Sequence, residues 1–87
     1  MTDGGGEAVL YYRDGCHLCE ELAAVLFRGW PEHAAAVQWR DVDSDPAWRE
    51  TYGLRVPVLL IGERLVCEFR PDIRRLSECF GEPVNSL

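Results

Sequence analysis

Two cysteines, Cys16 and Cys19, stand three positions apart where a strand-like run of residues gives way to a helix-like run. The preceding run, residues 8–12, is continuously apolar and rich in β-formers, as in a strand that is covered on both faces of a parallel sheet. The following run, from about residue 17 to residue 28, repeats apolar residues at helical spacing. The junction therefore predicts an α/β domain in which both thiols lie at the N-terminal end of a helix.

This position changes the chemistry expected of the first thiol. Backbone N–H groups at a helix N-terminus lack partners within the helix and attract negative charge. The pKa of the Cys16 thiol should therefore fall below the free value of about 8.5. Cys19 lies one helical turn further on and can reach Cys16 to close a disulfide. Our hypothesis is a dithiol redox site in which Cys16 attacks and Cys19 resolves.

His17 stands between the two cysteines and has two interpretations. As a cation it would stabilise the Cys16 thiolate, favour the reduced state and make the protein a better oxidant. It fits equally well as a solvent-exposed residue of the first helical turn. The sequence does not choose between a modulating residue and an exposed one.

Turn signals divide the rest of the chain into short elements. Residues 30–36 form either one further helical turn after Pro31 or a loop. The remaining elements are a strand over 37–42, a short helix over about 46–52, strands over 58–61 and 65–69, and a last helix that Pro71 and Asp72 open and Gly81 ends. The predicted order is β-α-β-α-β-β-α. Its first half is a βαβ unit, so the first two strands should be parallel with a right-handed crossover.

The length of 87 residues predicts one domain over 1–87, with a flexible leader over 1–6 and a loose tail over 82–87. No apolar run approaches the roughly 20 residues that span a bilayer, so we expect no membrane association. The N-terminus lacks the basic and apolar regions of an export signal, which favours the cytoplasm. The net charge of −6 argues against a nucleic-acid partner, because phosphate binding needs a basic face.

Four cysteines also raise the question of a disulfide scaffold or a metal site. Cytosolic thiols are kept reduced, which disfavours a scaffold. A zinc site needs four ligands, whereas Cys67 and Cys79 are separated by eleven residues and do not form a second Cys-x-x-Cys pair. We favour core packing for these two over a regulatory disulfide between them, and we commit to no metal ligand.

The order of elements, the cysteine pair and Val56-Pro57 together resemble the thioredoxin superfamily, and specifically a minimal glutaredoxin. Residues 12–19, Tyr-Arg-Asp-Gly-Cys-His-Leu-Cys, resemble the glutaredoxin active-site segment. Residues 41–43 and 52–59 resemble the middle of that family, through its cis-proline. The resemblance extends over roughly residues 7–80. It is closest to a group of small bacterial glutaredoxin-like proteins in which Cys-His-Leu-Cys-Glu recurs.

The resemblance implies a four-stranded mixed sheet of order 2-1-3-4, flanked by helices, with the first and last helices on one face and the short helix on the other. It also implies a cis bond between Val56 and Pro57, with the proline ring beside Cys16. In this fold the backbone of the residue before that proline, here Val56, pairs with the substrate backbone like an added strand. Val56 and Pro57 are therefore candidate substrate-binding residues.

The resemblance also bears on glutathione. Glutaredoxins usually carry two glycines after the fourth strand, where the backbone and a following acidic residue hold the γ-glutamyl end of glutathione. The corresponding segment here is residues 68–72, and Phe69 and Pro71 replace the glycines. Arg70 and Asp72 are the implied substrate-binding residues of this segment, with Asp72 receiving the glutathione amine. Glutathione thus stays open as a co-substrate.

A lysine often precedes the first cysteine of a glutaredoxin. Arg13 takes that place here and is implied to modulate the site by supplying positive charge. Carboxylates nearby act in the opposite sense, because they disfavour a thiolate or a glutathione carboxylate. These carboxylates belong to Asp14, Glu20 and Glu21.

The function that we predict is a small thiol-disulfide oxidoreductase whose partner is a disulfide-containing protein or a low-molecular-weight thiol. Glutathione or a flavoprotein reductase would return electrons to the Cys16/Cys19 dithiol, and no resident cofactor is expected. We expect a monomer. Two alternatives stay open: a non-catalytic thioredoxin-fold module that docks a partner as a redox switch, and a metal binder that uses Cys16, Cys19 and a further thiolate.

Overall fold

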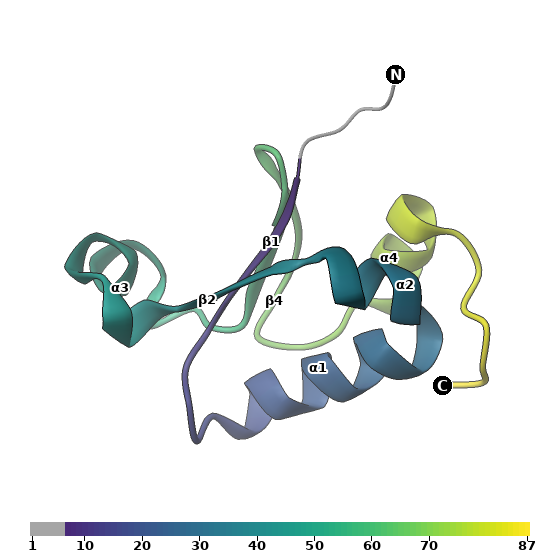
Figure 1. Ribbon diagram of the computed structural model, residues 1–87, viewed down its shortest axis with the longest axis horizontal. Coiled ribbons are helices and arrows are strands. Elements are labelled where there is room, and N and C mark those ends of the chain that lie inside the picture. The colour runs from purple at the N-terminus through teal and green to yellow at the C-terminus, as the bar shows by residue number, and fades with distance from the viewer. Residues whose placement is uncertain (1–6) are drawn as a thin grey trace.

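The computed structural model describes residues 7–87, so the leader predicted for residues 1–6 lies outside the described part. Four strands and four α-helices follow one another with one 3-10 helix among them (Figure 1). In chain order they are β1 (Ala8–Tyr12), α1 (His17–Gly29), α2 (Pro31–Ala36), β2 (Gln38–Asp41), η2 (Val42–Ser44), α3 (Pro46–Tyr52), β3 (Val58–Ile61), β4 (Arg64–Glu68) and α4 (Ile73–Phe80).

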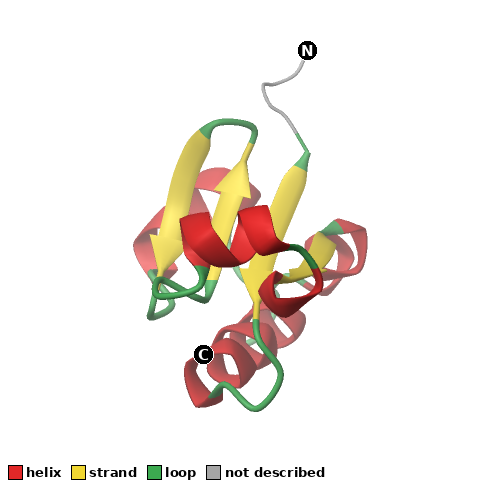
Figure 2. Cartoon of the chain, turned by 90° about the vertical axis from the view of Figure 1, so that its left-hand side faces the viewer, coloured by secondary structure: helices red, strands yellow, loops and turns green. Residues whose placement is uncertain are grey.

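The four strands form one mixed sheet in the order β2-β1-β3-β4, which confirms the predicted order 2-1-3-4 (Figure 2). β1 pairs with β2 in parallel, with Leu10 opposite Trp39. On its other side β1 pairs with β3 in the antiparallel sense, with Leu10 opposite Leu59. β3 and β4 form the predicted antiparallel hairpin, and their register shifts between Leu59 and Leu60. Because β1 is paired with β2 on one side and with β3 on the other, the position at which the chain leaves β1 toward Cys16 is fixed by both neighbours.

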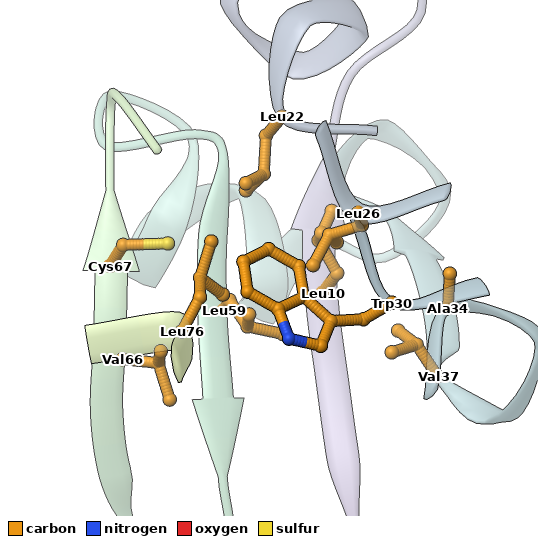
Figure 3. Packing of buried hydrophobic residues seen from close by; sticks show 10 residues of the cluster. All are labelled: Leu10, Leu22, Leu26, Trp30, Ala34, Val37, Leu59, Val66, Cys67 and Leu76. Carbon is orange, nitrogen blue, oxygen red and sulfur yellow. The ribbon is translucent and has the colours of Figure 1, made fainter. Parts of the chain in front are cut away.

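Side chains of a strand alternate between the two faces of a sheet, and β1 divides the core accordingly. Leu10 belongs to the larger cluster, which α1 and α4 cover through Leu22, Leu26 and Leu76. Figure 3 shows Trp30 among the leucines of this cluster. On the opposite face, the smaller cluster contains Tyr11, Val42 and Val58, with Trp48 and Tyr52 of α3 packed against it. The helices therefore divide between the faces as the resemblance implied.

Two short helices add to the predicted order. Residues 30–36 adopt the helical alternative: α2 begins with Pro31 at its first position, where the missing N–H costs nothing. The second strand ends at Asp41 rather than Val42, since the Asp41 carboxylate accepts the backbone N–H of Asp43 at 2.9 Å and starts η2. Val42 is fully buried nonetheless.

The last strand also ends one residue earlier than predicted, at Glu68. Phe69 has φ = 67°, in the left-handed region that favours glycine. The N–H of Arg70 donates to the carbonyl of Glu68 at 2.7 Å, which turns the chain away from the sheet. This left-handed residue occupies the place where the resemblance expects a glycine.

We expected residues 82–87 to be loose, but they lie against the C-terminal end of α1. The N–H of Val84 donates to the carbonyl of Gly29 at 2.7 Å. Arg28 donates to the carbonyl of Ser86 at 2.6 Å, and the Asn85 amide donates to the carbonyl of Arg28 at 2.9 Å. The tail thereby satisfies carbonyls that the end of a helix leaves without partners.

Candidate active site

Cys16 caps the N-terminus of α1 with its own side chain. β1 ends at Tyr12, and Gly15 turns the chain with φ = 77°. The Cys16 sulfur then accepts the backbone N–H of Cys19, with a separation of 3.2 Å between the N and Sγ atoms. The side chain of Cys16 is half-buried. The sulfur thus occupies the N-cap position of α1 and satisfies one of the backbone N–H groups that the first helical turn leaves without a partner.

Cys19 lies in a different environment from Cys16. Its side chain is buried, with 5% of it exposed. Burial, followed by the hydrogen bond to Cys16, raises the pKa of the Cys19 thiol to about 12, while the backbone N–H and the charge of Arg13 act to lower it. At neutral pH Cys19 is therefore a protonated thiol. The pair thus consists of a half-buried sulfur at the N-cap, that of Cys16, and a buried, protonated sulfur, that of Cys19.

Val56 and Pro57 lie just before β3, and the peptide bond between them is cis. Pro57 is buried and Val56 is half-buried. Within residues 7–87, neither the N–H nor the carbonyl of Val56 takes part in a backbone hydrogen bond. The carbonyl of Pro57 instead accepts the N–H of Phe69 at 3.0 Å, which joins this segment to the end of β4.

Arg13 is held by an ion pair on the side of the sheet where β1 and β2 end. Its Nε and Nη2 atoms donate to the two carboxylate oxygens of Asp43 at 2.9 and 3.2 Å. Its Nη1 atom donates to the carbonyl of Gly53 at 3.1 Å. The hydrogen bond from Arg13 lowers the pKa of the Asp43 carboxyl below its ordinary value, and Arg49 adds to this effect. Arg13 thus connects the loop before Cys16 to two other segments.

Sequence reasoning did not single out Asp43 or Gly53 as site residues. The signal for Asp43 was present, because the carboxyl ends of two neighbouring parallel strands meet at one edge of a sheet. Arg13 follows β1 directly, and Asp43 follows β2 at a distance of two residues. Gly53 offered no such signal, since its carbonyl reaches Arg13 only through the packing of α3.

His17 is exposed as the first residue of α1. Among the hydrogen bonds of residues 7–87, none joins its side chain to Cys16 or Cys19. His17 thus follows Cys16 directly in the chain and is separated from Cys19 by Leu18, and it is exposed to solvent.

Arg70 and Asp72 line a hollow of about 450 Å³ between β4 and the start of α4. Asp72 caps α4: its carboxylate accepts the N–H of Arg75 at 3.1 Å and lies 3.9 Å from the Arg75 guanidinium. The Arg70 side chain is exposed. The hollow therefore offers both signs of charge, with the Asp72 carboxylate already engaged as a cap.

Cys67 lines the hollow at Arg70 and Asp72 and belongs to the larger core cluster. Cys79 is partly buried against that cluster. All four cysteines are free thiols in the structure. Burial raises the pKa of the Cys67 thiol to about 11. In the described part of the chain, no three side chains of His, Cys, Asp or Glu gather closely enough to hold a metal ion.

A cysteine-capped helix after a central strand, a second cysteine one turn on, and a mixed sheet of order 2-1-3-4 define a small protein with the thioredoxin fold, of the glutaredoxin type. The family model described as "Glutaredoxin-like domain (DUF836)" matches residues 7–80. The chain belongs to this family.

Two solved structures resemble the chain. Protein XcR50 from X. campestris is 35% identical, with a TM-score of 0.66 over 83% of this chain and 92% of that one. Protein Ne2328 from Nitrosomonas europaea is 26% identical, with a TM-score of 0.64 over 92% of this chain and 96% of that one. No curated protein matches the sequence. Within residues 7–87, no helix has the length and apolar character needed to cross a membrane.

Proposed function

We propose that this protein is a thiol-disulfide oxidoreductase that uses the Cys16/Cys19 dithiol. The observation that carries the proposal is the cap of α1, where the half-buried Cys16 sulfur accepts the Cys19 N–H at 3.2 Å. The buried Cys19 thiol, with its pKa raised to about 12, complements it as a thiol that acts second. Membership of a glutaredoxin-like family agrees with a redox role.

The reaction takes place in two exchange steps. The Cys16 thiolate attacks one sulfur of the substrate disulfide, and the other substrate sulfur leaves as a thiolate that takes a proton from solvent. Cys19 then gives up its proton to water or to the departing thiolate and attacks the Cys16 sulfur. The second substrate sulfur leaves, so the substrate gains two electrons and the protein gains the Cys16–Cys19 disulfide. Glutathione or a flavoprotein reductase restores the dithiol.

Several features support a polypeptide as the substrate. Among the described residues, none forms a backbone hydrogen bond with Val56 next to Pro57, which suits pairing with an extended peptide. Two apolar side chains in the adjoining segments are exposed: Leu54 is 95% exposed and Phe69 is 45% exposed. Phe69 is tied to Pro57 through its N–H. An apolar residue of a bound polypeptide would cover these side chains.

A low-molecular-weight thiol has a second place to bind in this proposal. Arg70 and Asp72 line the hollow beside α4 and offer a cation and a carboxylate to the charged ends of glutathione. Asp72 must keep its cap to Arg75 while it receives an ammonium group, and a carboxylate has lone pairs for both. Glutathione would then serve as the electron donor in solution.

The experiment is a turnover assay with a peptide disulfide and with oxidised glutathione, applied to wild type, Cys16→Ser and Cys19→Ser. We expect wild type to exchange both substrates, Cys16→Ser to be inactive, and Cys19→Ser to stop after one covalent step. Cys79→Ser is the matched control and should retain wild-type rates. If wild type exchanges no disulfide but still captures a protein partner when Cys16 is replaced, the protein is a docking module instead.

A further inference from the structure

A second hollow lies beside Cys19, separate from the hollow at Arg70 and Asp72. It has a volume of about 200 Å³ and opens between the loop before α1, the first turns of α1 and strand β2. Liquid water takes about 30 Å³ per molecule, so the hollow has room for roughly seven water molecules, which is enough for a guanidinium or ammonium group with part of its stem. The residues that line it include Tyr12, Arg13, Asp14, Cys19, Glu20 and Trp39.

Aromatic rings form two of its walls. The rings of Tyr12 and Trp39 meet edge to face, with their centroids 6.3 Å apart and their planes at 73°. Phe27 stacks on Trp39 with an angle of 10° between the planes, so it packs against one face of the indole. The faces of Tyr and Trp rings carry partial negative charge and attract cations within about 6 Å. Both rings line the hollow and offer aromatic surface to the methylene stem and charged head of a basic side chain.

The charges around the hollow also favour a cation. Asp14 and Glu20 line it with carboxylates, and both side chains are exposed. Arg13 lines it too, but its guanidinium is paired with the Asp43 carboxylate. Burial, and then the negative charges of Asp14 and Asp41, raise the pKa of the Tyr12 hydroxyl, which agrees with a negative potential at this wall. Glu20 also offsets the positive end of α1.

We propose that this hollow, the Tyr12–Trp39 pocket, binds the arginine or lysine side chain of a polypeptide partner. Under the proposed function, on which this step rests, the partner is the disulfide substrate, and its basic residue lies next to the cysteine that bonds to Cys16. Cys19 lines the pocket, so an occupied pocket places the basic residue beside the proposed resolving thiol. The pocket would thus select disulfides with a basic neighbour.

The binding arm of the test needs no turnover. N-acetyl-arginine amide is titrated into the reduced protein, and the indole N–H signals of the three tryptophans are followed by NMR. N-acetyl-citrulline amide is the matched probe, because it has nearly the same shape without the charge. Trp30 is buried in the core and Trp48 lies on the opposite face of the sheet, so both serve as internal references.

We expect the arginine probe to shift the Trp39 signal and to bind about five- to tenfold more tightly than the citrulline probe. Glu20→Gln should remove most of this difference. Glu21→Gln is the control, since it deletes the same charge from the next residue of α1, which does not line the pocket. Equal binding of the two probes, or equal shifts at Trp39 and Trp48, would overturn the proposal.

The kinetic arm separates this proposal from the proposed function. Two peptides carry a cysteine in a mixed disulfide with a chromophoric thiol, one with arginine and one with citrulline as the next residue. A several-fold higher kcat/KM for the arginine peptide, lost in Glu20→Gln, supports the pocket. Equal turnover of both peptides refutes its role in selection and leaves the oxidoreductase proposal standing. A protein that binds the arginine probe at Trp39 without turning over either peptide has the pocket but not the activity.

Discussion

Arg13 and Asp43 are thirty residues apart in the sequence and are joined in the structure by two hydrogen bonds of 2.9 and 3.2 Å. Arg13 directly precedes the turn to Cys16, and Asp43 lies in η2 beyond β2. A third hydrogen bond, from Arg13 to the carbonyl of Gly53, extends this link to the segment that leads to Val56 and Pro57. The Arg13 side chain therefore links the loop before Cys16 to the proposed docking segment.

Asp43→Asn should lower the stability of the protein in a pH-dependent way. The pKa of Asp43 is lowered in the folded state from an ordinary value of 3.8, so its contribution is present above that value and disappears as the pH falls through the folded-state pKa. We expect a lower melting temperature than wild type from pH 7 to about pH 4, and a difference between the two proteins that shrinks progressively as the pH falls further. Thermal unfolding at several pH values measures this.

Glu50→Gln is the control for that experiment, because Glu50 is an exposed carboxylate on the neighbouring helix α3. Its melting curve should follow wild type at every pH. A difference between Asp43→Asn and wild type that stayed constant down to pH 2 would show that the ionised carboxylate of Asp43 is not what stabilises the protein.

Gly53→Ala should destabilise the same region through sterics. A methyl group at this position would lie 2.5 Å from the backbone oxygen of Arg49 and 3.3 Å from the Arg13 guanidinium. Backbone must move to admit it, at a cost of about 1–3 kcal/mol in the free energy of unfolding. Denaturant unfolding measures the change. Thr51→Ala is the control, because Thr51 is exposed on α3, the helix that Gly53 caps, and its free energy of unfolding should stay within about 0.5 kcal/mol of wild type. An equally small effect of Gly53→Ala would contradict this packing.

The thiols of Cys16 and Cys19 should differ in their reactivity with iodoacetamide. Cys16 is half-buried, whereas Cys19 is buried with its pKa raised to about 12 and Cys67 is buried with its pKa raised to about 11. In the reduced Cys79→Ser protein at neutral pH, we expect carboxamidomethylation of Cys16 to be at least about tenfold faster than that of the other two thiols. Peptide mapping by mass spectrometry gives the order. Modification of Cys19 at the rate of Cys16 would refute the division of roles.

Much of the fold follows from local signals in the sequence. The apolar run before Cys16 and the helical spacing after it fix β1 and α1, and Gly62 marks the hairpin of β3 and β4. The secondary structure of residues 30–36 could not be predicted, because Pro31 is compatible with the first position of a helix and with a loop. The end of β2 depends on one side chain, because the Asp41 carboxylate accepts the backbone N–H of Asp43 and starts η2 in place of a further strand residue.

The site was predictable only where its residues are close together in the sequence. Cys16 and Cys19 come from one helical turn, so their contact follows from helix geometry. The pairing of Arg13 with Asp43 requires the β1–β2 register, and the Tyr12–Trp39 pocket requires two side chains from neighbouring strands to turn toward the same helix. Likewise, the tail is held by backbone groups of Arg28 and Gly29, which no sequence pattern reveals. These contacts depend on tertiary structure, which local propensity does not encode.

The most direct test of the central claim is to trap the first covalent step. Cys19→Ser is incubated with a peptide disulfide, and the intact mass is measured under non-reducing conditions. We expect one equivalent of peptide bound through a disulfide to Cys16, as located by mapping, and no such adduct in Cys16→Ser treated in the same way. A Cys19→Ser protein that stays unmodified, or that carries the peptide on Cys67 or Cys79 instead, would contradict a dithiol mechanism in which Cys16 attacks and Cys19 resolves.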